Sequence, residues 1–138
     1  MSTELVRSRF SAAKPLDWYS KESATYLAPD GRANVVASSE PLEPSTDSRS
    51  YAAAQGELLQ DEFPDYVEHA FGPSLVFGER AGFIRRFSWH PQDAEPVTQI
   101  QLYYAEGGRG YTATATALVE DFAEFHEGLT ALLDSLRI

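Results

Sequence analysis

A cluster of glycines is the part of this sequence that comes nearest to a catalytic motif. Gly107, Gly108 and Gly110 lie in the segment AEGGRGYTATATAL, residues 105–118. Glycine-rich loops cradle phosphates, and a P-loop places a lysine after its last glycine, but this chain has no lysine beyond Lys21. A dinucleotide-binding loop would lead into a helix, whereas the residues that follow alternate as in a strand. The glycines are therefore predicted to form a turn between strands, not a nucleotide site.

The other residue types that could do chemistry are scattered. The histidines His69, His90 and His126 lie in separate segments, and no pair has the HExxH spacing of zinc hydrolases. Ser74, in the segment GPSLV, lacks the second glycine of a nucleophile elbow. Acidic residues gather at 57–65 without the spacing of an EF-hand, so a solvated helix end explains them as well as a divalent cation does. These patterns predict no catalytic residue, no cofactor and no metal site.

Composition narrows the class of protein. The 138 residues are 43% hydrophobic and 12% aromatic, which suits one folded domain over residues 1–138. There is no cysteine, so disulfides and thiolate metal sites are excluded. The formal net charge of −10 would repel a nucleic acid, so no nucleic-acid partner is expected. The first ten residues contain no apolar run, from which we expect no signal peptide, no membrane insertion and a cytoplasmic location.

The strands on either side of the paired glycines can be aligned residue by residue. A two-residue loop at Gly107-Gly108 places Glu106 opposite Arg109. One side of the hairpin then carries the pairs Tyr104 with Tyr111, Leu102 with Ala113 and Ile100 with Ala115. The other side carries the pairs Tyr103 with Thr112, Gln101 with Thr114 and Gln99 with Thr116. This register separates an apolar face from a polar one, as a half-buried hairpin requires.

The remaining elements follow from periodicity and turn signals. Helical spacing of apolar residues after position 50 predicts a helix that is capped by Thr46 or Asp47 and ended by Pro64. A closing helix of about five turns begins at Val119 and carries an apolar stripe. Arg85 and Arg86 are adjacent in a strand, so one of them must lie on the buried side, where a carboxylate could pair with it. The predicted strands are 5–12, 23–28, 33–38, 66–71, 75–77, 82–89, 97–104 and 111–117.

The two faces of the glycine hairpin have different expected partners. The closing helix is the natural cover for the apolar face, because Ala113 and Ala115 are small enough to let it approach closely. The face with the Gln and Thr rows is left for solvent, for another helix or for a ligand. An ordinary solvated face is the simpler interpretation, since function resides in sites and not in folds. A platform that receives a partner segment is the functional interpretation.

The order of elements resembles a known family. The segments YLAPDGRANVVASSEPL, FPDYVEHAFGPSLVFGERAGFIRRFSW and VTQIQLYYAEGGRGYTATATA, followed by the closing helix, are similar to the DcrB-related proteins, small bacterial domains with a PsbP-like fold. The resemblance covers residues 10–138. It implies an α+β fold, in which a single antiparallel sheet of about six to seven strands has helices packed on its faces. It carries over no catalytic residues.

One branch of that family looks like the Eag-type chaperones of type VI secretion, cytoplasmic homodimers whose sheet surface shields apolar transmembrane segments of secreted effectors. The resemblance implies a non-enzymatic protein-binding domain, an adaptor or chaperone with a protein partner. Free edges of an antiparallel sheet also favour a homodimer. The alternative is a small-molecule-binding or hydrolytic enzyme with a site near the His90 loop. The candidate partner contacts on the open face are Gln99, Gln101, Tyr103, Thr112 and Thr114.

Overall fold

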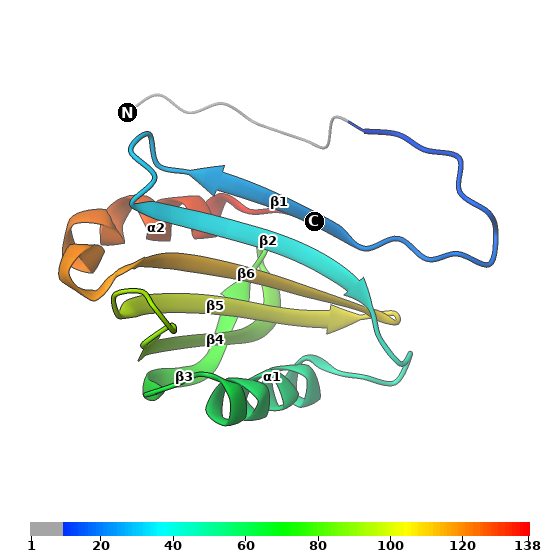
Figure 1. Ribbon diagram of the computed structural model, residues 1–138. Coiled ribbons are helices and arrows are strands. Elements are labelled where there is room, and N and C mark those ends of the chain that lie inside the picture. The colour runs from blue at the N-terminus through cyan, green and yellow to red at the C-terminus, as the bar shows by residue number, and fades with distance from the viewer. Residues whose placement is uncertain (1–9) are drawn as a thin grey trace.

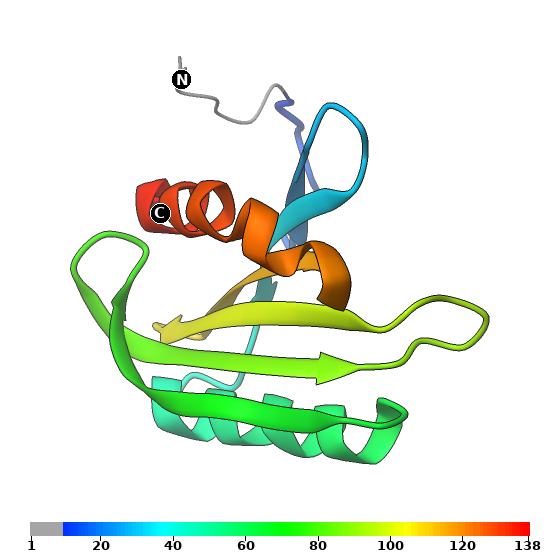
Figure 2. The same ribbon diagram turned by 90° about the vertical axis from the view of Figure 1, so that its left-hand side faces the viewer.

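The structure, a computed structural model, describes residues 10–138. Six strands form one antiparallel sheet in the order β1-β2-β6-β5-β4-β3, so β1 and β3 are its edges. Figures 1 and 2 show helices α1 and α2 on opposite faces of this sheet, which is the α+β architecture expected from the sequence. The elements are β1 (Glu22–Leu27), β2 (Ala33–Pro41), α1 (Ser48–Glu62), β3 (Val67–Val76), β4 (Arg80–Trp89), β5 (Val97–Glu106), β6 (Arg109–Leu118), η1 (Val119–Asp121) and α2 (Phe122–Ser135).

The β5–β6 hairpin has the predicted register. Gly107 and Gly108 form its turn with φ angles of 60° and 79°, a region that glycine enters without steric cost. All seven predicted pairs are present, from Glu106 opposite Arg109 down to Gln99 opposite Thr116. The alternation of side chains therefore separates two faces, each of which packs against its own helix.

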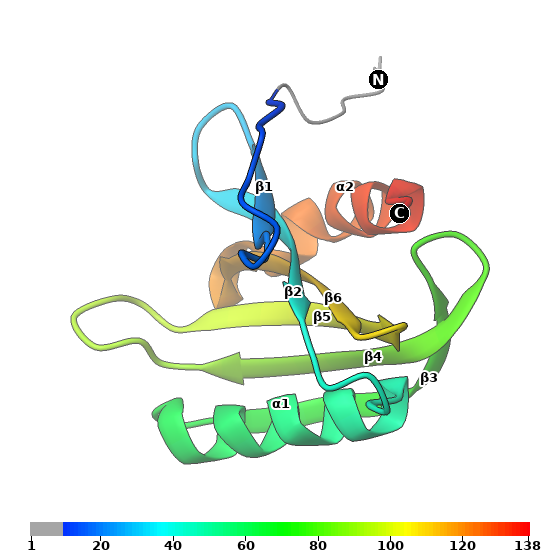
Figure 3. The same cartoon turned by 90° about the vertical axis from the view of Figure 1, so that its right-hand side faces the viewer.

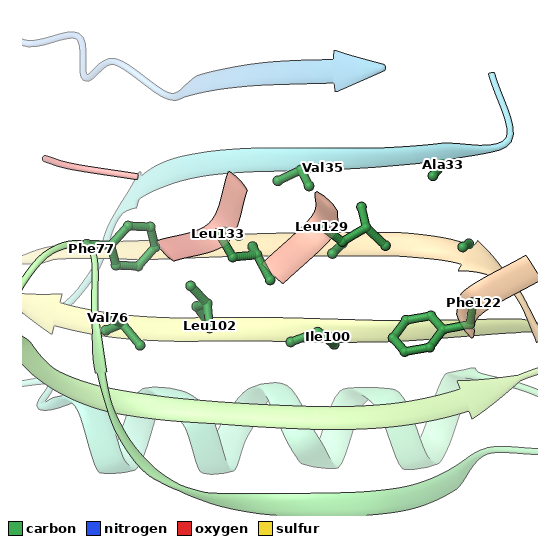
Figure 4. Close-up of a cluster of buried hydrophobic side chains, with 12 residues drawn as sticks. Ala33, Val35, Val76, Phe77, Ile100, Leu102, Phe122, Leu129 and Leu133 are labelled. Atoms are coloured by element: carbon green, nitrogen blue, oxygen red, sulfur yellow. The ribbon is translucent and has the colours of Figure 1, made fainter. Parts of the chain in front are cut away.

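The main hydrophobic core lies between α2 and the apolar face. Ala113, Ala115 and Ala117 of β6 are fully or almost fully buried, and their small side chains let α2 approach the sheet closely. Leu129 and Leu133 project from α2 toward β2, β5 and β6 (Figure 4). The closing helix covers the face that was predicted for it. Its first turn, η1, is a 3-10 helix, so the α-helix proper begins three residues later than expected.

The second core lies under α1, on the opposite face. Asp47 caps the helix by accepting a 2.8 Å hydrogen bond from the backbone N–H of Ser50, and the helix ends at Phe63, before Pro64. The hydroxyl of Ser48 ties the start of the helix to β5 by accepting from the N–H of Ala105 at 2.9 Å. Buried residues from α1, β4 and β5 meet here: Tyr51, Ala52, Phe83, Tyr103 and Ala105.

Two strand predictions were wrong or only partly tested. The expected strands 66–71 and 75–77 are one continuous strand, β3, which contains Pro73 and a β-bulge between Glu68 and Ala70. An edge strand tolerates proline because one side of its backbone has no neighbouring strand. The expected first strand, 5–12, falls mostly outside the described residues, and positions 10–12 are not in a strand.

Candidate functional site

The polar side of the β5–β6 hairpin belongs to one face of the whole sheet, called here the Gln/Thr face. Helix α1 covers half of this face and leaves the other half open. Helix α1 packs over β4 and β5 (Figure 3). Tyr103 lies beneath it and is fully buried, so the prediction that Tyr103 contacts a partner on an open surface is corrected. Gln99 and Gln101 of β5 are half-buried at the border of the covered half, and Thr112 and Thr114 of β6 are half-buried in the open half.

The open half comprises the side chains of β1, β2 and β6 on the Gln/Thr face. They form three rows across the sheet, and hydroxyl groups make up most of them. On β1 the side chains are exposed, and toward β6 they become half-buried. Leu27 is 68% exposed, so apolar surface accompanies the hydroxyls. The rows are Ser23–Ser38–Thr112, Thr25–Val36–Thr114 and Leu27–Asn34–Thr116.

A chain of hydrogen bonds joins the covered half to the middle row. Arg85 on β4 donates from Nη1 to the hydroxyl oxygen of Tyr103 at 2.8 Å. The Tyr103 hydroxyl donates to Oε1 of Gln101, and Nε2 of Gln101 donates to Oγ1 of Thr114 at 3.2 Å. Three predicted contact residues are therefore members of one network that begins at a buried cation.

A second chain runs parallel to the first. The indole N–H of Trp89 donates to Oε1 of Gln99 at 2.7 Å, and Nε2 of Gln99 donates to Oγ1 of Thr116 at 2.7 Å. Stacking on Phe63 fixes the indole ring, with the two ring centroids 3.9 Å apart. In the first row, the hydroxyls of Thr112 and Ser38 are hydrogen-bonded to each other at 3.1 Å.

Arg85 is the buried arginine that the sequence anticipated. Its residue exposure is 4%, and its Nε donates to Oε1 of Glu68 at 2.8 Å. Nη1 also donates to the backbone carbonyl of Ala52 in α1 at 3.2 Å, and the guanidinium lies 4.2 Å from the ring centroid of Phe71. A buried charge costs free energy unless it is paired and hydrogen-bonded, and these contacts meet that condition.

Burial also changes the acidity of two tyrosines in this region. Desolvation under α1 raises the pKa of Tyr103 to about 12, although the nearby Arg85 acts in the opposite direction. Desolvation likewise raises the pKa of Tyr51 to about 12. Both hydroxyls are therefore protonated at neutral pH, and the Tyr103 hydroxyl is able to donate to Gln101.

The other chemically capable residues do not form a catalytic constellation among residues 10–138. His90 has a half-exposed side chain with Nδ1 at 3.8 Å from a carboxylate oxygen of Asp65. His69 is hydrogen-bonded to Ser88 at 2.7 Å, and His126 is an exposed residue whose ring lies 5.5 Å from that of Phe122. Across this part of the chain no three His, Asp or Glu side chains are placed to hold a metal ion. The described helices include none long and apolar enough to span a membrane.

A small cavity lies on the other face, between α2 and the β3–β4 hairpin. Its volume is about 220 Å³. Its lining includes Ile84, Ile100 and Leu102 from the sheet and Thr130 and Asp134 from α2. It is separate from the Gln/Thr face and contains none of the predicted contact residues.

Solved structures share this fold, although no protein-family model and no curated protein matches the sequence. One is PA94 from Pseudomonas aeruginosa, a protein of unknown function provisionally called a regulator. It has a TM-score of 0.77 and 16% identity over 90% of this chain and 88% of that one. Another is LpqN, which is involved in cell envelope biogenesis in Mycobacterium tuberculosis. It has a TM-score of 0.53 and 14% identity over 78% of this chain and 62% of that one. At these identities the likeness establishes the fold alone.

The sequence analysis did not predict the residues that orient the glutamine side chains, directly or through Arg85. Trp89 was not connected with Gln99, and Glu68 was not connected with Arg85. The signal for Arg85 was present, since one of two adjacent arginines had to lie on the buried side. The signal for Trp89 was the register of β4 against β5, which places Trp89 opposite Val97 and diagonally from Gln99.

Proposed function

We propose that this chain is a non-enzymatic protein-binding domain, an adaptor or chaperone for an apolar segment of a secreted effector, and that the segment binds on the open half of the Gln/Thr face. The observation that carries the proposal is the composition of that surface, three rows of hydroxyl and amide groups, exposed on β1 and half-buried on β2 and β6, interrupted by Leu27 and Val36. Polar side chains that can bond to a helix backbone, mixed with apolar area, suit an apolar segment that retains its hydrogen-bonding groups.

The flank of α1 supports the same surface as a binding site. Tyr51 lies at the β6 side of the helix, because its ring contacts the position of Gly110 and its hydroxyl donates to Glu40 of β2 at 3.2 Å. Leu58 is two helical turns further along on the same side, and it is 49% exposed. Leu58 of α1 and Leu27 of β1 therefore both add exposed apolar surface on the side of the sheet that α1 covers in part.

The resemblance to the DcrB-related proteins is a second, independent support, because one branch of that family shields apolar segments with its sheet surface. The acidic chain also suits a protein partner better than a polyanion. A binding domain needs no catalytic group, so the solitary histidines need no role in it.

Site-specific photo-crosslinking in the source cells tests this proposal. A benzophenone amino acid replaces Thr25, an exposed residue in the middle row, and in the control it replaces Ala131, an exposed residue of α2 on the opposite face. We expect an adduct from position 25 whose crosslinked peptide is an apolar segment of another protein. Equal adducts from both positions, or a polar crosslinked peptide at position 25, would refute the proposal.

We further propose that two chains associate through the β1 edge. β1 pairs with β2 without a bulge and has no proline, and among residues 10–138 no strand pairs with its outer side, so this edge suits the addition of another strand. Light scattering during size-exclusion chromatography should give twice the 15.3 kDa mass. Ala24→Lys on β1 should shift the protein toward the monomer, because a lysine on an edge strand opposes pairing. A monomer at all concentrations would contradict the proposal.

A further inference from the structure

The hydrogen-bond chains of the Gln/Thr face have a direction, and it is fixed at their starting points. Arginine and the tryptophan indole can only donate hydrogen bonds. In the first chain, Arg85 donates to the oxygen of Tyr103, which leaves the Tyr103 hydrogen for Oε1 of Gln101. In the second chain, Trp89 donates directly to Oε1 of Gln99. Both amides are therefore oriented the same way, with their NH₂ groups toward β6.

The orientation of the two amides determines whether the hydroxyl groups of Thr114 and Thr116 donate or accept hydrogen bonds on the open half. Gln101 donates to Oγ1 of Thr114, and Gln99 donates to Oγ1 of Thr116. Each threonine oxygen is used as an acceptor by the sheet, so its own hydrogen is the group left to bond elsewhere. On the far side of Thr114 the row continues with Val36, whose side chain has no acceptor. The hydroxyl hydrogen of Thr114 is thus able to donate to a group on the open half.

We infer that Thr114 and Thr116 are one-way hydrogen-bonding positions on the open half: Arg85 and Trp89 set the direction of the two chains, and the two threonines present O–H donors to an apolar helix whose accessible groups are carbonyl oxygens. The inference deepens the proposed function and depends on it for the identity of the partner. In a helix each interior N–H is already bonded to the carbonyl four residues earlier, while each carbonyl oxygen keeps a second lone pair. An apolar helix therefore offers acceptors and no donors along its middle.

The direction of the chains can be measured without a partner. The γ-methyl groups of threonine are ¹³C-labelled, and the protein is titrated with dimethyl sulfoxide, which only accepts, and with methylammonium, which only donates. We expect the Thr114 and Thr116 signals to respond to dimethyl sulfoxide and not to methylammonium. Gln101→Glu keeps the acceptor for Tyr103 and removes the donor to Thr114, so the Thr114 hydroxyl turns inward and its response to dimethyl sulfoxide is lost. The opposite pattern in either protein would overturn the inference.

Binding of a defined peptide tests the consequence for the partner. The probe is an acetylated and amidated twelve-residue alanine–leucine peptide made soluble by a polyethylene glycol tail. Thr114→Val and Thr116→Val should each weaken binding about threefold to tenfold, as loss of one net hydrogen bond does. Thr130→Val on the opposite face serves as the matched control and should change binding less than twofold.

The outcomes separate the two proposals. If the threonines respond as donors but the peptide does not bind to the unmodified protein, the direction of the chains is supported and the proposed function fails. If the peptide binds and the valine variants bind it equally well, the surface is used but its donors do not contact the segment, and the inference is overturned.

Discussion

Gly56 of α1 lies directly against the guanidinium of Arg85 in β4. A Cβ atom added at Gly56 would come within 2.5 Å of Nη2 and 2.9 Å of Cζ of Arg85. The helix can cross the sheet over a buried arginine because this one position has no side chain. The glycine, which weakens α1 as an isolated helix, thereby makes room for the cation from which the first hydrogen-bond chain starts.

Replacing Gly56 with alanine should therefore lower stability. Arg85 cannot move aside freely, because Glu68, Tyr103 and Ala52 all bond to it. We expect Gly56→Ala to reduce the free energy of unfolding by about 1–3 kcal/mol, as overpacking of a buried site does. Urea denaturation measures this change.

Gly128 of α2 is the matched control, since a Cβ atom added there would meet no atom within 4 Å. Gly128→Ala should raise the free energy of unfolding by about 0.5–1 kcal/mol through helix propensity alone. A stabilising effect at Gly56 as well would show that Arg85 is not held in place.

The pairing of Glu68 with Arg85 should contribute more than a surface ion pair. Glu68→Gln leaves the buried guanidinium without a countercharge, but the Glu68 side chain is 37% exposed and solvent screens part of the loss. We expect a decrease of about 1–2 kcal/mol in the free energy of unfolding. Glu106→Gln provides the comparison, because Glu106 pairs with Arg80 at 3.8 Å on the surface, and its removal should cost less than about 0.5 kcal/mol. Equal effects would contradict the assignment.

Alkaline pH should destabilise the protein through its buried tyrosines. The pKa of both Tyr51 and Tyr103 is raised to about 12 in the folded state, whereas an unfolded tyrosine titrates near 10. Folding favours the protonated form, so this contribution is complete below pH 10 and is lost as the pH rises from 10 to 12. Urea denaturation across this range, combined with tyrosinate absorbance, checks the prediction. Tyr51→Phe should reduce the pH dependence, and titration of every tyrosine near pH 10 before unfolding would refute it.

The small residues of β6 set the distance between α2 and the sheet. Ala115 is fully buried beneath the helix, so Ala115→Leu should reduce the free energy of unfolding by about 1–3 kcal/mol. Ala131→Leu, an exposed substitution on α2, should stay within about 0.5 kcal/mol of the unmodified protein. Calorimetry or chemical denaturation compares the two. If Ala115→Leu left stability unchanged, α2 would not be packed closely at this point.

Local patterns predicted the hairpin and its faces well. Strict alternation on both sides of Gly107-Gly108 allows one register only, because a slip of one residue would move every side chain to the opposite face. The location of Gln99, Gln101, Thr112 and Thr114 on a common face followed from that register, and the structure has the same pairs. The cap at Asp47 was also predictable, since it depends on residues adjacent in sequence.

Long-range packing was not predictable in the same way. The apolar residues of α1 indicated a helix but not the strands it would cover, and so they did not reveal that Tyr103 is buried. Two strands were predicted, 66–71 and 75–77, yet β3 is continuous through Pro73 because the strand is at an edge. The pairing of Glu68 with Arg85 depends on a bulge between Glu68 and Ala70, and a bulge of this kind leaves no distinct pattern in the local sequence.

The bulge and Pro73 also make the two margins of the sheet unequal. On β3 the proline removes one backbone donor and the bulge interrupts the ladder, so further strands cannot be added there in regular succession. On β1 the ladder is uninterrupted. If two chains associate through β1 as proposed, the irregular β3 margins would lie at the two outer edges of the joined sheet, which favours a closed pair over a fibre.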